Sequence, residues 1–330
     1  MATAPLTKPE AARRRTRGSV LQRYGTEVTL ASILVVLCIF LSFASPVFLT
    51  SENLSNLVKQ SAINGIIALG MTVVIITGGI DLSVGSVVGL AGVIVGMLMT
   101  SGTPPWLAAI LAVIVCFFVG VGNGIMVHEG GIAPFIATLG SMTMVRGLVE
   151  LLTNARTISG LPEAFLRFGN ADYFGLPSLF WVWAILAVIL TVVLNRTRFG
   201  RNVYAIGSSP EVARLSGISL RANLYLAYGI GGLMAGIGGV VLTARVRMAA
   251  PTAGSTYELY AIAAAVIGGA SLSGAQGTIP GSVLGALIMT TIASGGNLLG
   301  IDAFMLQIAI GALIVLAVWI DRIRKGTTAS

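Results

Sequence analysis

The chain has 330 residues, of which 55% are hydrophobic and only 10% are charged, and its mean hydropathy is +0.93. An average soluble domain carries about 25% charged residues, so this composition excludes an ordinary soluble protein and indicates a polytopic membrane protein. The formal charge of +8 does not indicate a nucleic-acid partner, because the basic residues flank apolar segments rather than form one basic face.

Apolar runs predict an all-α transmembrane bundle of about ten crossings, with eight or nine as the alternative. The runs lie at residues 28–48, 61–79, 84–100, 106–127, 132–152, 178–195, 223–243, 257–272, 280–299 and 304–320. Arg146 and Glu150 interrupt the fifth run, and their spacing lets them pair on one helix face. A cleaved signal peptide is the alternative for the first run, but its long basic flank favours an uncleaved crossing.

The distribution of Lys and Arg predicts that both termini are cytoplasmic. With ten crossings, 14 of the 20 basic residues fall on one side, in the N-terminal segment, the loop at 196–222 and the C-terminal tail. The positive-inside rule assigns this side to the cytoplasm. We therefore predict a flexible basic tail at 1–24, one transmembrane domain at 25–321 that includes the loop 196–222, and a second tail at 322–330.

Glycine contributes 42 residues, roughly twice the usual share of about 7%. Four pairs have the G-x-x-x-G spacing that brings helices close together in lipid, with a role in permeation as the alternative. They are Gly85/Gly89, Gly92/Gly96, Gly232/Gly236 and Gly281/Gly285. Residues 78–83 (G-G-I-D-L-S) also resemble residues 268–273 (G-G-A-S-L-S), which suggests an internal repeat, although glycine-rich low complexity can produce such a match.

No pattern predicts catalysis, metal binding or nucleotide binding by this chain. A Walker A motif needs a lysine directly after glycine, and Lys8, Lys59 and Lys325 do not follow one. The single histidine, His128, and two cysteines within apolar runs argue against a zinc site and a disulfide framework. We expect no enzyme activity, no catalytic residue, no bound cofactor and no metal.

The polar stretch at residues 208–218 (S-S-P-E-V-A-R-L-S-G-I) predicts a short helix. Ser209 suits its N-cap, Pro210 its first position and Gly217 a left-handed turn at its end, while Glu211 favours the positive pole. About two helical turns are marginal alone, so the helix should dock against something. It either lies on the bilayer surface or fits a groove on a separate ATPase as a coupling helix.

Four motifs follow one another in a recognisable order. They are T-G-G-I-D-L-S-V-G-S at 77–86, G-S-S-P-E-V-A-R-L-S-G-I at 207–218, P-T-A-G at 251–254 with Y-E-L at 257–259, and I-G-G-A-S-L-S-G at 267–274. With these motifs the chain resembles, from about residue 53 to 320, the permease family of bacterial ribose-type ABC sugar importers, the inner membrane components of binding-protein-dependent transport.

This resemblance implies a bacterial inner-membrane permease for ribose or a similar monosaccharide. It implies four partners besides the lipid bilayer: a second permease copy, two cytoplasmic ATPase subunits that use ATP and Mg, and a periplasmic sugar-binding protein. It also assigns ATPase coupling to the short helix. The residues concerned are Ser209, Pro210, Glu211, Ala213, Arg214 and Gly217, whereas Val212 departs from the second position of the E-A-A-x-x-x-G importer pattern.

Further residues are candidates for a gate or translocation path. They are Asn64, Gly78, Gly79, Asp81, Ser83, Asn123, Gly268, Gly269, Ser271 and Asn297, with Thr72 and Ser141 as further neutral groups. A carboxylate at bilayer depth is costly, so Asp81 should cap the next helix, pair with a cation or face a wet cavity.

Arg245, Arg247 and Glu258 fall near the predicted outer mouth, where they either dock the binding protein or anchor the chain at the interface. Two other classes of protein stay open as alternatives. One is an ion-coupled secondary transporter of a small polar solute, against which the scarcity of intramembrane carboxylates argues. The other is a glycine-packed scaffold without transport activity.

Overall fold

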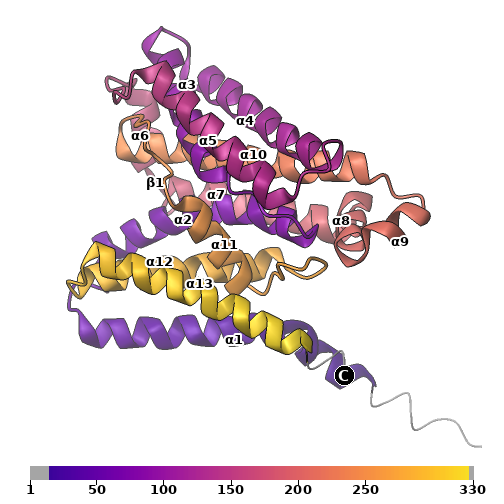
Figure 1. Ribbon diagram of the computed structural model, residues 1–330. Coiled ribbons are helices and arrows are strands. Elements are labelled where there is room, and N and C mark those ends of the chain that lie inside the picture. Colours follow the sequence, from indigo (N-terminus) through magenta and orange to yellow (C-terminus); the bar gives the residue numbers. More distant parts are fainter. Residues whose placement is uncertain (1–14, 327–330) are drawn as a thin grey trace, which may run out of the picture.

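The computed structural model describes residues 15–326, which form a helical bundle with one small hairpin (Figure 1). The helices are α1 (Arg15–Ala44), α2 (Ser51–Ile76), α3 (Val84–Thr100), α4 (Pro105–His128), α5 (Pro134–Thr153), α6 (Glu163–Asn170), α7 (Ser178–Arg196), α8 (Arg198–Ser208), α9 (Pro210–Leu215), α10 (Leu220–Val246), α11 (Tyr257–Ile267), α12 (Ile279–Leu298) and α13 (Ala303–Gly326). Strands β1 (Asp172–Tyr173) and β2 (Leu176–Pro177) pair antiparallel.

The all-α prediction is confirmed, and each of the ten predicted runs overlaps a helix. Seven described helices are long and apolar enough to cross a membrane: α1, α2, α4, α5, α7, α10 and α12. Helices α3 and α11 are apolar but shorter, with 17 and 11 residues, and Phe304–Leu316 is an apolar segment of α13. The predicted run at 257–272 is wrong in its last part, because α11 ends at Ile267 and turns follow.

The predicted boundaries of the tails stay predictions, and two helices extend into the predicted tails. Helix α1 begins at Arg15, inside the segment 1–24 that the sequence predicts to be flexible, and α13 continues to Gly326, inside the predicted tail 322–330. The parts of those predictions that concern residues 1–14 and 327–330 lie outside the described residues. Helix α1 therefore begins before the first predicted apolar run, and α13 ends after the last one.

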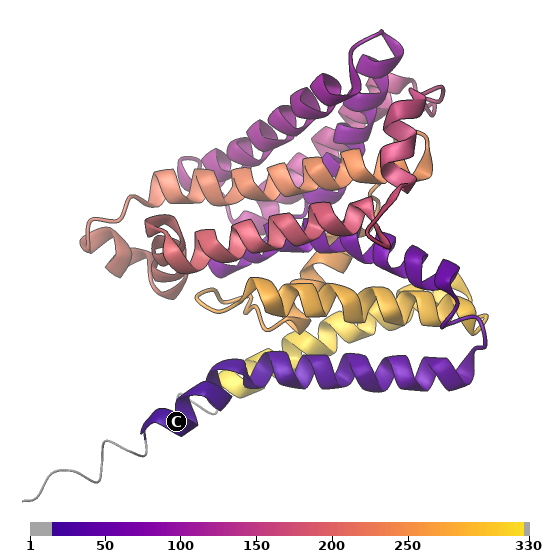
Figure 2. The ribbon, with the colours of Figure 1, turned by 180° about the vertical axis from the view of Figure 1, so that it is seen from behind.

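The centre of the bundle is α2, whose residues from Ser61 to Ile76 are all buried. Helix α10 packs against it in the opposite direction, since Gly70 of α2 meets Met234 and Ile67 meets Gly238. Helix α12 is likewise antiparallel to α2, because Asn64 hydrogen-bonds Thr290 and the hydroxyls of Thr72 and Ser282 lie 2.6 Å apart. Figure 2 shows α7, α10 and α12 covering the side of the bundle that is hidden in Figure 1.

The helices approach one another closely at the G-x-x-x-G pairs, as predicted. Side chains at Gly232 and Gly236 of α10 would collide with the backbone and side chain of Cys116 on α4. Side chains at Gly281 and Gly285 of α12 would meet the carbonyls of Gly268 and Ala264 at the end of α11. These contacts are packing contacts between helices of one chain.

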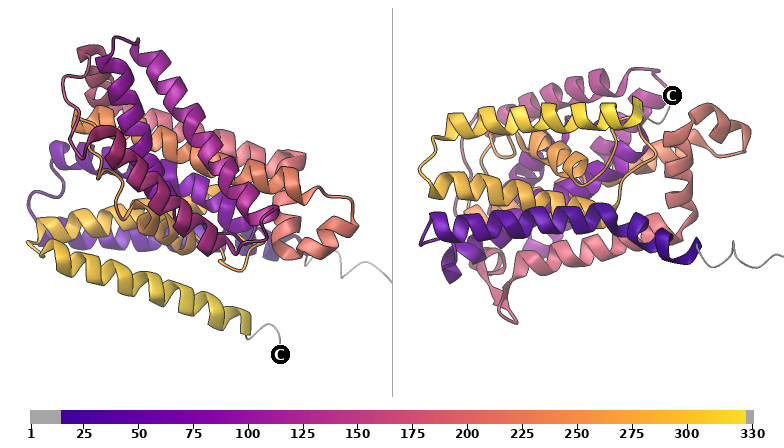
Figure 3. Two further views of the ribbon diagram at one scale, coloured as in Figure 1. Left: turned by 45° about the horizontal axis from the view of Figure 1, so that its top comes forward. Right: turned by 90° about the horizontal axis from the view of Figure 1, so that it is seen from below.

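The two ends of the bundle differ, and we name them by the short helices they hold. The α9 end carries α8, α9 and the beginning of α10, and the described chain also begins and ends there (Figures 1 and 3). The hydrogen bond from the Thr278 hydroxyl to Glu27 ties α1 to the beginning of α12 at this end. The α6 end carries α6 and the hairpin, which pack beside the end of α10, where Gly169 touches Ala244.

Two passages through the bundle are only partly helical. Residues 77–83 continue from the end of α2 in an irregular conformation and lead to α3. Helix α3 starts beside the middle of α10, and in its second turn the Val88 carbonyl lies against Gly239 of α10. Residues 249–256 return from the α6 end along α3, so that Gly254 lies against Gly85. Helix α11 then completes the passage toward the α9 end.

We predict that Gly120→Ala destabilises the protein whereas Gly122→Ala on the same helix does not. A methyl group at Gly120 would collide with the Tyr228 carbonyl of α10, but one at Gly122 meets open space. Overpacking of this kind costs about 1–3 kcal/mol. Thermal unfolding of the purified protein in detergent measures the difference, and equal melting temperatures would contradict the close α4–α10 contact.

Candidate functional site

The short helix predicted at 208–218 forms as α9. The Ser209 hydroxyl accepts a hydrogen bond from the Val212 amide at 3.3 Å, and Pro210 is the first helical residue. Gly217 adopts a φ of 79°, and its amide donates to the Arg214 carbonyl. Ala213 is buried, whereas Glu211, Val212, Arg214 and Leu215 are exposed. The helix thus presents charged and apolar side chains away from the bundle.

Helix α8 joins α9 directly to the interrupted parts of the bundle. Gly207 lies against the Ile76 carbonyl at the end of α2, so a side chain there has no room. The Tyr204 hydroxyl donates to the Gly277 carbonyl at 2.7 Å, and burial raises the pKa of this phenol, which keeps it a donor. Helix α8 therefore contacts the end of α2 and the loop 268–278 between α11 and α12, through the Gly207 backbone and the Tyr204 hydroxyl.

The two similar glycine-rich stretches end their helices in the same way. Gly78 after α2 and Gly269 after α11 have φ values of 82° and 92°, and their amides donate to the carbonyls of Ile75 and Val266. Glycine adopts this left-handed conformation without steric cost, which explains its presence at both helix ends.

The turns that follow are also alike. The Ser83 amide donates to the Asp81 carboxylate, and the Ser273 amide donates to the Ser271 hydroxyl. The two stretches lie beside each other, because Gly78 faces the Ser273 carbonyl, and next to them the Ala275 amide donates to the Ile76 carbonyl at 2.9 Å. The matching residues thus form one junction beneath α8.

Asp81 is fully buried at this junction and organises the turn before α3. Its carboxylate accepts hydrogen bonds from the Ser83 amide at 2.9 Å, the Ser83 hydroxyl at 2.6 Å and the Asn123 amide group at 3.3 Å. The prediction that Asp81 caps the next helix is wrong in position, because α3 begins at Val84 and its N-cap residue is Ser83. Asp81 instead links residues 77–83 to α4.

The other predicted polar path residues do not gather in one cavity. Asn64 and Thr72 are buried between α2 and α12, where they form the hydrogen bonds described above, and Ser141 is buried on α5. Asn297 is exposed near the end of α12. The structure thus unites Asp81, Ser83 and Asn123, and places the glycines Gly78, Gly79, Gly268 and Gly269 at the two helix ends.

The predicted outer-mouth residues separate into two places. Exposed Arg247 lies 3.7 Å from the Glu163 carboxylate of α6, and Arg245 is half-buried near the end of α10. Glu258 lies deeper, at the beginning of α11, where its carboxylate occupies the space that a side chain at Gly85 would need. Glu258 therefore belongs to the contact between α3 and α11.

Arg146 has a structural role that sequence reasoning missed. Its guanidinium donates to the carbonyls of Pro251 at 2.6 Å and Ala253 at 3.1 Å, so it secures the returning segment 249–256. The predicted pairing of Arg146 with Glu150 is not among the ion pairs of the described residues. A basic residue inside an apolar run was the available signal, but its partners lie about a hundred residues away in the sequence.

These features define an integral membrane transport protein, because buried polar groups and interrupted helices line the interior of a membrane bundle. Residues 53–318 match the family described as branched-chain amino acid transport system / permease component, and the chain belongs to this family. The resemblance stated from the sequence is confirmed, and the protein is a membrane permease.

Several relatives are similar over nearly their whole length. The ribose import permease protein RbsC of Bacillus subtilis is 44% identical, with 88% of this chain and 90% of the relative covered. The D-allose transport system permease protein AlsC of Escherichia coli is 38% identical over 91% of this chain and 92% of its own. The galactose/methyl galactoside import permease protein MglC of Escherichia coli is also 38% identical, over 88% and 93%. No solved structure matches the chain.

We predict that Asp81→Leu lowers stability much more than Asp81→Asn. Leucine removes the acceptor of the Ser83 amide and hydroxyl, at a cost of about 1–3 kcal/mol for each buried donor left unpaired, while the Asn123 amide group keeps only the Ser83 hydroxyl as its acceptor. Asparagine keeps one acceptor oxygen. The yield of folded protein and its melting temperature in detergent measure the difference, and two variants that match the unchanged protein would refute a role for this carboxylate in the junction.

Proposed function

We propose that this chain is the membrane-spanning permease subunit of an ATP-driven importer of a monosaccharide, ribose or a similar sugar. The observation that carries the proposal is the exposed helix α9, which α8 joins to the end of α2 and to the loop 268–278 between α11 and α12. The relatives named for ribose, allose and galactose transport support the sugar as cargo. A sugar is delivered by a periplasmic binding protein on the side of the α6 end.

The proposed topology has ten crossings of the bacterial inner membrane. Eight are continuous helices, and two, residues 77–100 and 249–267, are partly irregular. The α9 end faces the cytoplasm, which agrees with the excess of Lys and Arg in the N-terminal segment, the loop 196–222 and the C-terminal tail. Both termini then lie in the cytoplasm.

In this mechanism two partner ATPases bind ATP and Mg, and this chain performs no covalent chemistry. Closure of the ATPases moves α9, whose exposed Glu211, Val212 and Leu215 fit a groove on the partner. Helix α8 transmits the movement through Gly207 and Tyr204 to the junction of residues 77–83 and 268–278. The cavity between this chain and a second permease copy then changes the side from which it is accessible.

The other coupling residues support the shape of α9. Ser209 is the N-cap of α9, Pro210 is its first residue and Gly217 follows its end in a left-handed conformation. Ala213 is the buried residue of the helix, and Arg214 lies near the negative, C-terminal end of the helix dipole. Asp81, Ser83 and Asn123 set the position of α3 relative to α4. Arg245 and Arg247 lie at the α6 end, where the binding protein docks.

An ion-coupled secondary transporter is the competing proposal, and one experiment separates the two. Vesicles that contain only this chain should take up no sugar under a proton or sodium gradient. Vesicles with the complete importer should take it up when ATP is supplied to the ATPase side. Gradient-driven uptake by the chain alone would overturn the importer proposal.

We predict that Gly217→Pro uncouples ATP hydrolysis from sugar uptake in the reconstituted importer. Proline cannot adopt the left-handed φ of Gly217 and lacks the amide that donates to Arg214, so α9 loses its end. Uptake should fall by about tenfold or more, the equivalent of 1.4 kcal/mol of lost coupling, while ATP hydrolysis continues.

Gly160→Pro is the matched control, because Gly160 is also exposed, has a φ of 78° and lies near the opposite end of the bundle. It should leave the ratio of uptake to hydrolysis unchanged. If both variants lose uptake to the same extent, the effect is a general loss of structure and the coupling role of α9 is refuted.

A further inference from the structure

The hairpin of β1 and β2 turns at a residue that is poorly suited to the turn. Its two central residues, Phe174 and Gly175, have φ values of 54° and 78°, and positive values at both positions are what a two-residue type I′ turn requires. Asparagine or aspartate is the usual residue before the glycine of such a turn. A bulky side chain such as phenylalanine is strained in this left-handed conformation. The hairpin thus carries a large apolar residue where a small polar one would suit the backbone.

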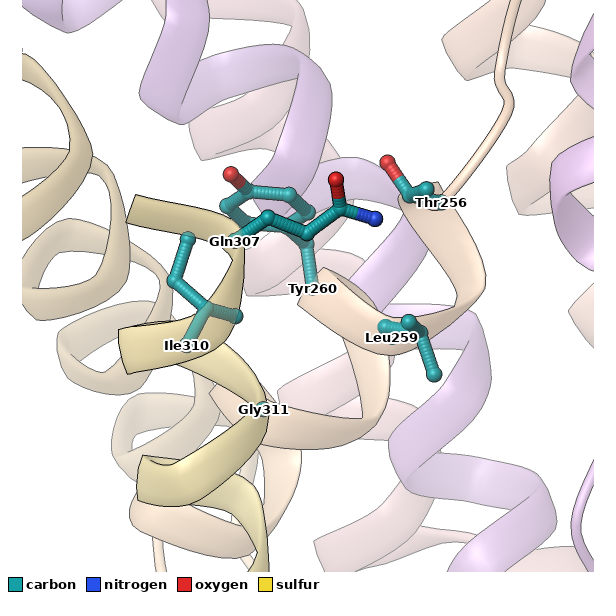
Figure 4. Close-up of a pocket in the computed structure, with 6 residues that line it drawn as sticks. All are labelled: Thr256, Leu259, Tyr260, Gln307, Ile310 and Gly311. Atoms are coloured by element: carbon teal, nitrogen blue, oxygen red, sulfur yellow. The ribbon is translucent and has the colours of Figure 1, made fainter. Parts of the chain in front are cut away.

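The Phe174 side chain is also almost uncovered by the rest of the protein. It is 96% exposed, the largest exposed fraction among the large hydrophobic residues that the structure describes. Tyr173, its neighbour in β1, is 52% exposed. Tyr260 differs from both, since it is half-buried and lines a cavity of about 150 Å³ between α11 and α13, together with Gln307 (Figure 4). The hairpin therefore presents its aromatic side chains to surroundings outside the bundle.

Contacts with α7 fix the direction in which the hairpin points. The rings of Phe174 and Trp181 meet edge to face, with their centroids 6.1 Å apart. The Trp181 indole donates a hydrogen bond to the Tyr173 carbonyl at 3.0 Å. Because Trp181 lies in the first turn of α7, the tip of the hairpin lies beside the beginning of this helix.

Trp181 is the first of a row of exposed residues on one face of α7. Ile185, Val188 and Val192 follow it at spacings of four, three and four residues, so all of them lie on the same side of the helix. Helix α7 contains no glycine, whereas close contacts between membrane helices favour small residues. This face of α7 therefore faces lipid, and the hairpin lies at its end.

The length of α7 places the hairpin at the boundary between hydrocarbon and water. The helix has 19 residues, which span about 28 Å at 1.5 Å per residue. The hydrocarbon layer is about 30 Å thick, so α7 is just long enough to cross it. The exposed Arg196 at its last position indicates the headgroup level at the α9 end. The hairpin and Trp181 then lie at the opposite boundary, the level at which aromatic residues are enriched in membrane proteins.

We infer that the tip of the β1–β2 hairpin inserts into the headgroup region of the leaflet at the α6 end, where Phe174, Tyr173 and Trp181 anchor the bundle in the membrane. Lipid accounts for the unusual residue in the turn, because the exposed ring leaves water and this gain offsets the backbone strain. With the α9 end in the cytoplasm, as proposed above, this leaflet is the outer one. Such a contact is independent of the substance that the permease carries.

The anchor also fixes the level of the helices that the hairpin connects. The Ser178 amide at the beginning of α7 donates to the Ala171 carbonyl at 2.9 Å, and the Ser178 hydroxyl donates to the Phe168 carbonyl of α6. Gly169 of α6 touches Ala244 near the end of α10. The aromatic tip is thereby linked to the ends of α6, α7 and α10.

An asparagine substitution distinguishes an anchor from a turn that lies in water. Asparagine adopts the left-handed conformation more readily than phenylalanine, so Phe174→Asn should stabilise a hairpin that is surrounded by water. If the ring is anchored in lipid, the same variant should lower the melting temperature of the permease in phospholipid nanodiscs by about 2 °C or more. Phe174→Trp keeps an interfacial ring and should melt close to the unchanged protein.

Ala155→Asn is the matched control, because Ala155 is exposed, has a φ of 56° and lies in the loop between α5 and α6. This variant should melt at the same temperature as the unchanged protein or at a higher one. A Phe174→Asn protein that is as stable as the unchanged protein, or more stable, would overturn the anchor.

A nitroxide label measures the depth of the hairpin directly. The label is attached to Phe174→Cys, to Ile189→Cys in the middle of α7 and to Ser216→Cys after α9, each in a Cys38→Ala background, because Cys116 is fully buried. The full chain in phospholipid vesicles is exposed to oxygen, which concentrates in lipid, and to a water-soluble nickel chelate. The ratio of oxygen to nickel collisions at residue 174 should be higher than at residue 216 and lower than at residue 189.

The same measurement tests whether a protein covers the hairpin instead. A collision ratio at residue 174 that equals the ratio at residue 216 would place the tip in water and overturn the anchor. Nickel access at residue 174 that disappears only when the periplasmic binding protein is added would assign the hairpin to docking of that protein, and would overturn the anchor as well.

Discussion

The structure depends on how the backbone N–H and C=O groups of two non-helical stretches find hydrogen-bond partners inside a membrane bundle. Lipid offers no hydrogen bonds, so irregular backbone at that depth needs protein or water as its partner. Asp81 provides acceptors for residues 77–83, and Arg146 provides donors for the carbonyls of residues 249–256. These two ionisable residues therefore hold the segments that distinguish this bundle from a simple set of continuous helices.

The same interruptions bring the beginnings of α3 and α11 together. Each helix starts inside the bundle, and the Glu258 carboxylate in the first turn of α11 lies against Gly85 in the first turn of α3. The beginning of a helix carries partial positive charge, so a carboxylate is favourable beside it. Glycine at positions 85 and 254 permits this approach, because a side chain at either would collide with the other segment.

Sequence reasoning predicted the elements that local chemistry determines. Apolar runs located the helices, and the pattern from Ser209 to Gly217 gave both ends of α9, since caps and left-handed turns depend on neighbouring residues. It did not predict that residues 249–256 return into the bundle, because those turns look like an ordinary loop. Nor did it predict the partners of Arg146, which are far away in the sequence and are brought close only by the packing of α3 against α5 and α11.

The abundance of glycine also affects how movement passes through the protein. Between α9 and the junction, Gly207 meets the Ile76 carbonyl, and Gly274 meets Gly207 in turn. Contacts between backbones leave no flexible side chain to absorb a displacement, so we expect a shift of α8 to move the end of α2 and the loop 268–278 with it. Closely packed elements tend to shift between discrete arrangements rather than deform continuously. A junction of this kind suits the proposed mechanism, in which small movements at α9 would be passed to residues 77–83 and 268–278 and so to α3 and α11.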